Sequence, residues 1–157
     1  MIGIRPYDPA ADFPALRACF IELQTWERQL EPALPEPEAV AEIYLAAMLE
    51  DCAETSGRVF VAEADGAVIG FVSVLGKVTP TADESLEPHA YVSDLVVRTG
   101  ERGHGIGAKL MAQAEAFACE AGVARLKVGV LVRNARTAAF YRRCGFRDYA
   151  TQMVKTL

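Results

Sequence analysis

Three glycines crowd into residues 102–107, which read RGHGIG. Glycine this dense costs conformational entropy, so we expect a ligand to come close to this stretch of backbone. A helical pattern follows, and the unpaired N–H groups at the start of a helix attract anions. Glycines let these N–H groups close around a phosphate, while Arg102 and Lys109 add positive charge. The sequence therefore predicts a phosphate or pyrophosphate site at a helix N-terminus.

Two common phosphate-binding motifs fit this segment poorly. Gly103, Gly105 and Ala108 match a variant of the dinucleotide fingerprint, which needs an acidic residue after the next strand to hold the ribose. The next apolar run ends instead in Arg133 and Asn134. A P-loop needs glycine directly before its lysine, and Ala108 holds that place. A nucleotide-binding oxidoreductase and a P-loop protein are therefore both disfavoured.

A second motif comes one predicted helix and one predicted strand later. Asn134 precedes Tyr141 by seven residues, and Gly145 and Phe146 follow. Seven residues are two helical turns, so Asn134 and Tyr141 share one face of a helix. In this order, the two motifs resemble those of the GCN5-related N-acetyltransferase (GNAT) superfamily. The resemblance covers residues 58–148, and the opening strand and two helices fit the family's N-terminal order more loosely.

The resemblance implies a binding mode for acetyl-coenzyme A as the co-substrate. The pyrophosphate would lie on the backbone amides of residues 102–108, and the pantetheine arm would pair with residues 95–97 like an added strand. Asn134 would steady the pantetheine, and Tyr141 would lie near the coenzyme sulfur. Many members have alanine where this chain has Thr137. The expected cofactor-binding residues are Leu95, Val96, Val97, Arg102, Gly103, His104, Gly105, Ile106, Gly107, Ala108, Asn134 and Tyr141.

Acetyl transfer from a thioester sets three chemical requirements. The amine must be neutral, the developing oxyanion needs a hydrogen-bond donor, and the departing thiolate needs a proton. A backbone N–H within residues 95–97 can serve the oxyanion. The phenol of Tyr141, a group with an ordinary pKa of about 10, can protonate the thiolate, so we expect Tyr141 to be catalytic. The alternative for Tyr141 is a core aromatic whose hydroxyl is hydrogen-bonded.

The sequence leaves the general base open between Asp94, Glu87, His89 and a water chain. Asp94 lies in an apolar strand, where burial would raise the pKa of its carboxyl group. The favoured interpretation of Asp94 is a structural carboxylate, hydrogen-bonded to a neighbouring loop or helix end. Strict alternation along the strand places Asp94 on the same face as Val92 and Val96. Alternation alone does not tell whether that face meets the acceptor.

Charge divides the chain into an acidic part and a basic part. Residues 1–94 contain 17 acidic and 5 basic side chains, whereas residues 95–157 contain 4 acidic and 11 basic ones. The basic part suits the phosphates of coenzyme A, and the acidic part favours an amine acceptor that carries positive charge. The competing interpretation is a solvated acidic surface without a binding role.

We expect the acceptor site where the chain is least typical of the family. The candidate substrate-binding residues are Trp26, Tyr91 and Ser93. The proline-rich break after the first helix and the polar loop 79–89 would form its walls. That loop contributes the acids Asp83, Glu84 and Glu87, and Glu27 and Glu31 near the end of the first helix would favour a cationic amine on the same side. The sequence does not distinguish which amine is the acceptor: a polyamine, an aminoglycoside, an amino acid, a peptide N-terminus or a lysine side chain.

Hydrophobic patterning predicts an alternation of strands and helices. The predicted elements are a strand at 2–8, helices at 8–30 and 37–54, a hairpin at 58–78 that turns at Asp65 and Gly66, a strand at 90–97, a helix at 105–121, a strand at 124–132, a helix at 134–144 and a closing strand at 147–157. The predicted class is α/β (α+β), with a GNAT-type mixed, mostly antiparallel central sheet and helices on both faces.

Length and composition favour a single GNAT acetyltransferase domain over residues 1–157. No apolar run reaches membrane-span length and no secretory signal pattern is present, so we expect a cytoplasmic protein without a membrane partner. Four scattered cysteines without a CxxC pair argue against a metal site. The net charge of -5 argues against a nucleic-acid partner, and a homodimer stays open. The alternative function is a non-catalytic acyl-coenzyme A-binding or sensing module of the same fold.

Overall fold

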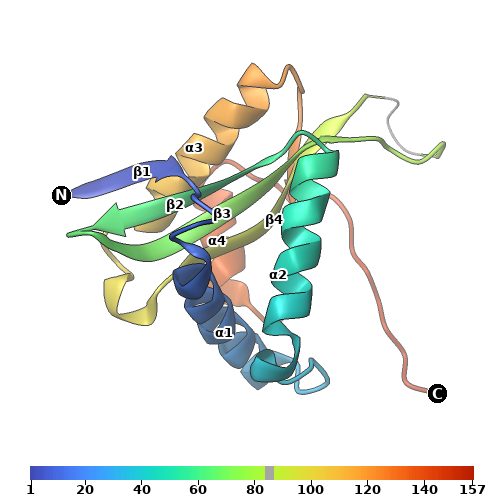
Figure 1. Cartoon of the computed structure of the whole chain (residues 1–157). Coiled ribbons are helices and arrows are strands. Elements are labelled where there is room, and N and C mark those ends of the chain that lie inside the picture. Colours follow the sequence, from blue (N-terminus) through green and yellow to red (C-terminus); the bar gives the residue numbers. More distant parts are fainter. Residues whose placement is uncertain (84–86) are drawn as a thin grey trace.

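A mixed sheet of five strands forms the centre of the computed structural model, which describes residues 1–83 and 87–157 (Figure 1). In spatial order the strands are β1 (Ile2–Pro6), β2 (Arg58–Ala64), β3 (Ala67–Val78), β4 (His89–Val97) and β5 (Leu126–Val128). Neighbouring strands are antiparallel except β4 and β5, which are parallel. The predicted mixed, mostly antiparallel sheet is confirmed.

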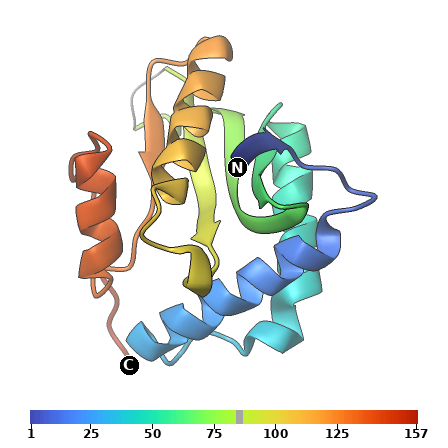
Figure 2. The same cartoon turned by 90° about the vertical axis from the view of Figure 1, so that its left-hand side faces the viewer.

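Helices cover both faces of the sheet, as predicted. α1 (Phe13–Leu30) and α2 (Pro37–Glu54) pack on one face, and α3 (Ile106–Glu120) and α4 (Ala135–Arg143) contribute to the core on the other. Figure 2 shows α4 at one edge of the molecule, beside α3. The core under α1 and α2 includes Leu16, Phe20, Leu45 and Phe71. The core on the α3 side includes Val72, Val92, Leu110, Met111 and Tyr141.

Turn and cap residues end several of these elements where the sequence predicts it, although α1 begins at Phe13 and not at residue 8. Asp65 and Gly66 adopt φ values of 51° and 79°, the left-handed pair that a tight two-residue hairpin requires. α2 begins at Pro37, where the missing N–H of proline has no cost because the first turn leaves that group unpaired anyway. Asn134 caps α4 by accepting a hydrogen bond from the backbone nitrogen of Thr137. Local sequence therefore determines most boundaries.

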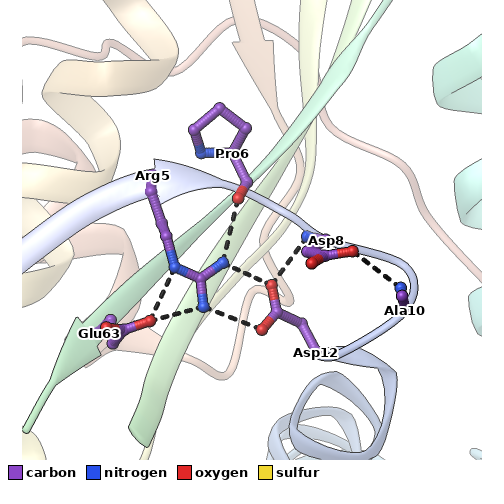
Figure 3. A network of polar contacts seen from close by, with 6 residues as sticks. All are labelled: Arg5, Pro6, Asp8, Ala10, Asp12 and Glu63. Atoms are coloured by element: carbon purple, nitrogen blue, oxygen red, sulfur yellow. Dashed lines mark hydrogen bonds and ion pairs between the residues drawn. The ribbon is translucent and has the colours of Figure 1, made fainter. Parts of the chain in front are cut away.

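An ionic network fastens the end of β1 to the start of α1 (Figure 3). The guanidinium of Arg5 donates to both carboxylate oxygens of Asp12, at 2.6 and 2.9 Å, and to Glu63 on β2 at 2.7 Å. Asp12 is buried and also accepts from the backbone nitrogen of Asp8 at 2.8 Å. These bonds lower the pKa of Asp12. The network thus fixes the direction in which α1 leaves the sheet.

The C-terminal part differs from the prediction in two places. β5 comprises only Leu126–Val128, although the pattern predicts a strand at 124–132. The prediction of a closing strand at 147–157 is wrong, because these residues form no strand in this chain and are exposed. An alternating pattern shows that a segment is suited to a sheet, but a strand also needs a neighbour with free backbone groups.

The sequence also led to expectations about membrane-spanning helices, metal sites and cysteines. Over the ranges 1–83 and 87–157, no helix is long and apolar enough to cross a membrane. The same residues contain no group of three or more His, Cys, Asp or Glu side chains that could hold a metal ion. The four cysteines are free thiols, of which Cys19 and Cys52 are buried and Cys119 is exposed.

Candidate active site

The glycine segment lies between the end of β4 and the start of α3. Gly103 and Gly105 adopt φ values of 88° and 77°, a left-handed conformation that other residues rarely take. Gly105 is the N-cap of α3, and Lys109 N makes the hydrogen bond to Gly105 O that closes the first turn. The backbone N–H groups of residues 106–108 therefore have no acceptor within the helix. The predicted helix N-terminus is confirmed, and its dipole favours an anion.

Two contacts fix this loop to the rest of the fold. The Nε of Arg102 donates to the carbonyl oxygen of Val97 at 2.9 Å and ties the loop to the end of β4. A Cβ atom at Gly107 would lie 3.4 Å from the ring of Phe140, so the first turn of α3 packs directly against α4. A Cβ atom there would make an ordinary van der Waals contact, so packing alone does not require glycine at this position.

The two parallel strands of the sheet separate along their length. β4 and β5 pair only over residues 90–92 and 126–128. Beyond this point β4 continues to Val97, and in the described structure only β3 pairs with it there. The edge of β4 at residues 95–97 is therefore open on the side of β5. An extended ligand can add to such an edge through backbone hydrogen bonds, and this edge leads directly to the glycine segment.

A β-bulge at Ser93 changes which side chains of β4 share a face. Two consecutive residues of β3 pair with Asp94 and Val92, which leaves Ser93 as an extra residue. As a result Val92 lies in the core on the α3 side, whereas Asp94 and Val96 face α1 and α2. The alternation expected from the sequence, with Val92, Asp94 and Val96 on one face, is wrong. Bulges of this kind re-aim side chains and are frequent beside active sites.

Asp94 is a buried carboxylate held by neighbouring hydroxyl groups. Tyr44 Oη on α2 lies 2.9 and 3.0 Å from its two oxygens, and Ser73 Oγ donates to it at 3.1 Å. Ser73 Oγ also lies 2.6 Å from Ser93 Oγ, so the hydroxyl chain reaches the bulge. Burial raises the pKa of Asp94, and the hydrogen bonds oppose this rise. The partners of Asp94 thus lie within α2 and on β3, not on the loop or helix end that the favoured interpretation named.

Tyr141 is buried where α4 packs against the core on the α3 side. Its ring centroid lies 5.4 Å from that of Phe140 and 5.7 Å from that of Phe146. Burial raises the pKa of its phenol, and the negative charges of Asp94 and Glu27 raise the pKa further. A phenol in this position stays protonated at neutral pH and can donate its proton. Tyr141 and Val92 belong to the same core cluster, so Tyr141 lies on the α3 side of the sheet.

Asn134 combines a structural function with an available donor. It is buried, and its Oδ1 accepts from Thr137 N at 3.3 Å at the start of α4. An asparagine side chain has two further N–H donors, which this cap does not use. The amide nitrogen can therefore donate to a carbonyl group of an extended ligand.

Glu27, in the C-terminal half of α1, belongs to the same group of titratable side chains. Burial raises its pKa, and so does the charge of Asp94. Its own charge contributes to the raised pKa of Tyr44 and of Tyr141, after the larger effects of burial and Asp94. Sequence reasoning included Glu27 among five acids expected to favour a cationic amine, without ranking it above the others. Its position directly after Trp26, the single tryptophan, was the signal that could have singled it out.

The end of α1 also meets the segment between β5 and α4. Arg133 donates to the backbone oxygen of Leu30 at 3.1 Å. Trp26, one turn before that end, is 37% exposed. Tyr91 of β4 is half-buried, and a Cβ atom at Gly129 would lie 2.8 Å from its hydroxyl oxygen. Trp26 and Tyr91 thus lie on elements that border the separation of β4 and β5.

Other candidates from the sequence lie at the far end of the sheet. His89 begins β4, five residues before Asp94 and roughly 16 Å away along a strand. Glu87 lines a shallow hollow with residues 122–124, at the C-terminal end of α3 and hence opposite the glycine segment. Glu84 lies outside the described residues. The structure therefore does not bring His89 or Glu87 to Tyr141, and His104 is an exposed loop residue.

Comparison with known proteins places this arrangement in a family. The model of the acetyltransferase (GNAT) family matches residues 20–146. The chain belongs to the GNAT family. Members of this family transfer acetyl groups from acetyl-coenzyme A to amines, so the chain is an N-acetyltransferase. The resemblance inferred from the two motifs is confirmed.

Relatives of this GNAT chain include two enzymes named for antibiotics. An aminoglycoside N(6')-acetyltransferase type 1 from Stenotrophomonas maltophilia is 28% identical over 105 residues, 66% of this chain and 69% of that protein. A streptothricin acetyltransferase from Streptomyces lavendulae is 38% identical over 101 residues, 62% of this chain but only 50% of that protein. The structure of a GCN5-related N-acetyltransferase from Ralstonia eutropha superimposes with a TM-score of 0.74 at 21% identity, covering 100% of this chain and 99% of that one. This likeness covers the whole chain and shows that the two proteins share the same fold.

Proposed function

We propose that this N-acetyltransferase binds acetyl-coenzyme A between β4 and β5 and acetylates a primary amine of a positively charged small molecule. One observation carries the proposal: β4 is open on the side of β5 at residues 95–97, directly before the glycine segment, and Leu95 and Val97 pack against the core cluster that contains Tyr141. This edge supports a path for an extended ligand between a phosphate site and a proton donor.

The coenzyme would be held largely by backbone groups. Its pyrophosphate would accept hydrogen bonds from the N–H groups of residues 106–108, with Arg102 adding positive charge. Its pantetheine amides would pair with residues 95–97, and the free donor of Asn134 would meet a pantetheine carbonyl. The acetyl thioester would then lie near the bulge at Ser93, on the side of Tyr141.

The transfer would proceed by direct attack. A neutral amine would attack the thioester carbonyl carbon and form the C–N bond, while a backbone N–H of residues 95–97 stabilises the oxyanion. The C–S bond would then break, and the thiolate would take the proton of the Tyr141 hydroxyl. The proton lost by the amine would return to the phenolate through water or through a nearby carboxylate. The products are an acetamide and free coenzyme A.

The acidic side chains that raise the pKa of Tyr141 support a cationic acceptor. Glu27 and Asp94 both act electrostatically on Tyr141, and such carboxylates attract positively charged amines. The two relatives are named for an aminoglycoside and for streptothricin, which supports a small molecule with several amines. We assign this substrate class to the present chain and place its amines on the side of α1.

The test is an acceptor screen with acetyl-coenzyme A. An aminoglycoside, streptothricin, spermidine, an amino acid and a lysine peptide would each be incubated with the enzyme, and acetylated product would be detected by mass spectrometry. Product detection is preferable to a thiol reagent because Cys119 is exposed. We expect acetylation of the polyamine antibiotics. Binding of acetyl-coenzyme A without acetylation of any amine would instead favour the non-catalytic sensing module.

A further inference from the structure

A short turn joins the end of β4 to the glycine segment. β4 ends at Val97, and a single 3₁₀ turn, η1 (Thr99–Glu101), follows. The backbone nitrogen of Glu101 donates to the carbonyl oxygen of Arg98 at 2.9 Å and closes this turn. The glycine segment, residues 102–107, comes next. The position of η1 therefore sets where the glycine segment begins.

Glu22 on α1 binds the start of η1. Its Oε2 accepts hydrogen bonds from the backbone nitrogen of Thr99 at 2.9 Å and from the hydroxyl group of Thr99 at 3.1 Å. Its Oε1 accepts a hydrogen bond from the Nε of Arg98 at 3.1 Å. The first N–H group of a helix has no acceptor within the helix, and here a carboxylate supplies one. A side chain of α1 thus holds the loop that leads to the predicted phosphate site.

The contacts of Glu22 keep its carboxyl group ionised. Burial opposes ionisation, but the hydrogen bonds from Thr99 and Arg98 outweigh it and lower the pKa of Glu22. The side chain of Glu22 is 28% exposed, whereas that of Arg98 is 46% exposed. An ion pair with so exposed a partner contributes little. The bonds to Thr99 are therefore the ones that position the loop.

α1 gives this carboxylate a firm support. Cys19 and Phe20, in the turn before Glu22, are buried in the core under α1 and α2. At the other end of the helix, Arg133 donates to the carbonyl oxygen of Leu30 at 3.1 Å. Figure 2 shows α1 running below the start of α3 toward α4. The helix is thus attached on both sides of the separation between β4 and β5.

The glycine segment needs support from outside because glycine does not hold its own conformation. Gly103 and Gly105 adopt positive φ values here, and a glycine has other conformations of similar energy. A binding site that must be ordered when the ligand arrives loses affinity, because the ordering costs free energy. A loop that is fixed beforehand at η1 avoids part of this cost.

We propose that Glu22 is a positioning residue for the coenzyme: from α1 it fixes η1 and thereby the N–H groups that bind the pyrophosphate. This inference rests on the proposed function, which takes residues 106–108 as the pyrophosphate site. Glu22 contacts no reacting atom and acts through Thr99. The coenzyme site therefore depends on the same helix that carries Trp26 and Glu27 on the acceptor side.

Calorimetric titration with acetyl-coenzyme A tests this role. Glu22→Ala removes the acceptor of Thr99 and should raise the dissociation constant roughly tenfold, as expected when hydrogen bonds to a charged group are lost. Glu22→Gln keeps an acceptor oxygen for Thr99 and should recover most of the affinity. Arg98→Met removes only the exposed ion pair and should change the constant by less than about threefold.

The outcomes separate this inference from the proposed function. A parent chain that does not bind acetyl-coenzyme A refutes the proposed coenzyme site itself. A parent that binds, with an equal dissociation constant in Glu22→Ala, overturns the inference alone. The inference is also overturned if Glu22→Gln binds as weakly as Glu22→Ala, or if Arg98→Met does, because charge and not the bonds to Thr99 would then be decisive.

A matched variant on the same helix distinguishes positioning from a general loosening of α1. Arg28 donates to the carbonyl oxygen of Leu34 at 2.8 Å and pairs with Glu36, so it holds α1 to the proline-rich break. Arg28→Met should leave the dissociation constant of acetyl-coenzyme A unchanged. An equal weakening by Arg28→Met and Glu22→Ala would show that Glu22 only stabilises the helix, and would overturn the inference.

Steady-state kinetics with an amine that the enzyme acetylates gives a second readout. Glu22→Ala should raise the KM for acetyl-coenzyme A by about the factor seen in calorimetry and lower kcat much less, because the phenol of Tyr141 lies on another element. A fall in kcat without a rise in this KM would place the effect of Glu22 on the chemical step and contradict a positioning role at the phosphate site.

Discussion

Tyr141 holds the proton that the proposed reaction needs at the sulfur. Burial and the charges of Asp94 and Glu27 raise the pKa of its phenol, so the hydroxyl stays protonated over the whole working pH range. Tyr141→Phe keeps the ring and removes this donor. We expect kcat to fall about 10²- to 10⁴-fold, the range of general acid catalysis.

The same variant separates catalysis from packing. The ring contacts with Phe140 and Phe146 persist in phenylalanine, so the thermal shift caused by acetyl-coenzyme A should change little. Steady-state kinetics and thermal denaturation would be measured on the same preparation. A loss of coenzyme affinity in step with kcat would show that Tyr141 acts by packing alone.

Gly105 supports a prediction about the coenzyme site. Its φ of 77° is strained for a residue with a Cβ atom, so Gly105→Val should displace the N–H groups at the start of α3. We expect the thermal stabilisation by acetyl-coenzyme A to disappear. Gly100 is a nearby control, because its φ is not positive and a Cβ atom there would meet no atom within 4 Å. Gly100→Val should therefore keep the stabilisation. Stabilisation of Gly105→Val equal to that of the parent would contradict the phosphate site.

At the scale of elements, the network around Arg5 joins β1, β2 and the start of α1. Arg5→Met leaves Asp12 buried without its cation, and charged hydrogen bonds of this kind contribute about 2 kcal/mol each. We expect the free energy of unfolding, measured in urea at pH 7, to fall by about 2 kcal/mol in total. Arg17 pairs with two exposed acids on α2, so Arg17→Met should change it little.

The pH dependence of this effect follows from the direction of one pKa. The pKa of Asp12 is lowered below its ordinary value of 3.8 by Arg5, and ionised Asp12 therefore stabilises the folded chain at higher pH. This stabilisation is fully present above pH 3.8 and is lost as the pH falls through the lowered native value. The difference between the parent and Arg5→Met should shrink accordingly in acid. A difference that stays constant down to about pH 2 would exclude Asp12 as its source.

Elements with local signals were predicted correctly, and those that depend on a neighbour were not. The turn at Asp65 and Gly66, the start of α2 at Pro37 and the cap at Asn134 all follow from the preferences of single residues. The bulge at Ser93 depends on how β3 meets β4, and no residue of β4 indicates it. The short β5 and the unpaired segment 147–157 likewise depend on which edges are available. Backbone pairing across the sheet was therefore the part that could not be predicted from sequence.

At the scale of the whole molecule, the sequence indicates candidate residues for the coenzyme more clearly than for the acceptor. The glycine segment and Tyr141 lie in contiguous motifs, so their pattern was visible. The acidic residues of the first 94 positions are dispersed, and only folding separates Glu27, which acts on Tyr141, from Glu87 at the opposite end of α3. The acidic loop 79–89 is thus less suited to the acceptor than the end of α1.

This difference in position gives the last prediction. If the carboxylate of Glu27 attracts the acceptor, Glu27→Gln should raise the KM for a cationic amine several-fold, while the KM for acetyl-coenzyme A stays the same. Glu87→Gln removes an equal charge at the other end of the sheet and should leave both constants unchanged. The effect of Glu27→Gln should diminish from low to physiological ionic strength, because salt screens the attraction over about 8–10 Å. The rate should also rise with pH through the neutral range, since only the neutral amine attacks. Equal effects of the two variants would mean that net charge alone draws the amine, and an effect of Glu87→Gln only would return the acceptor to the 79–89 loop.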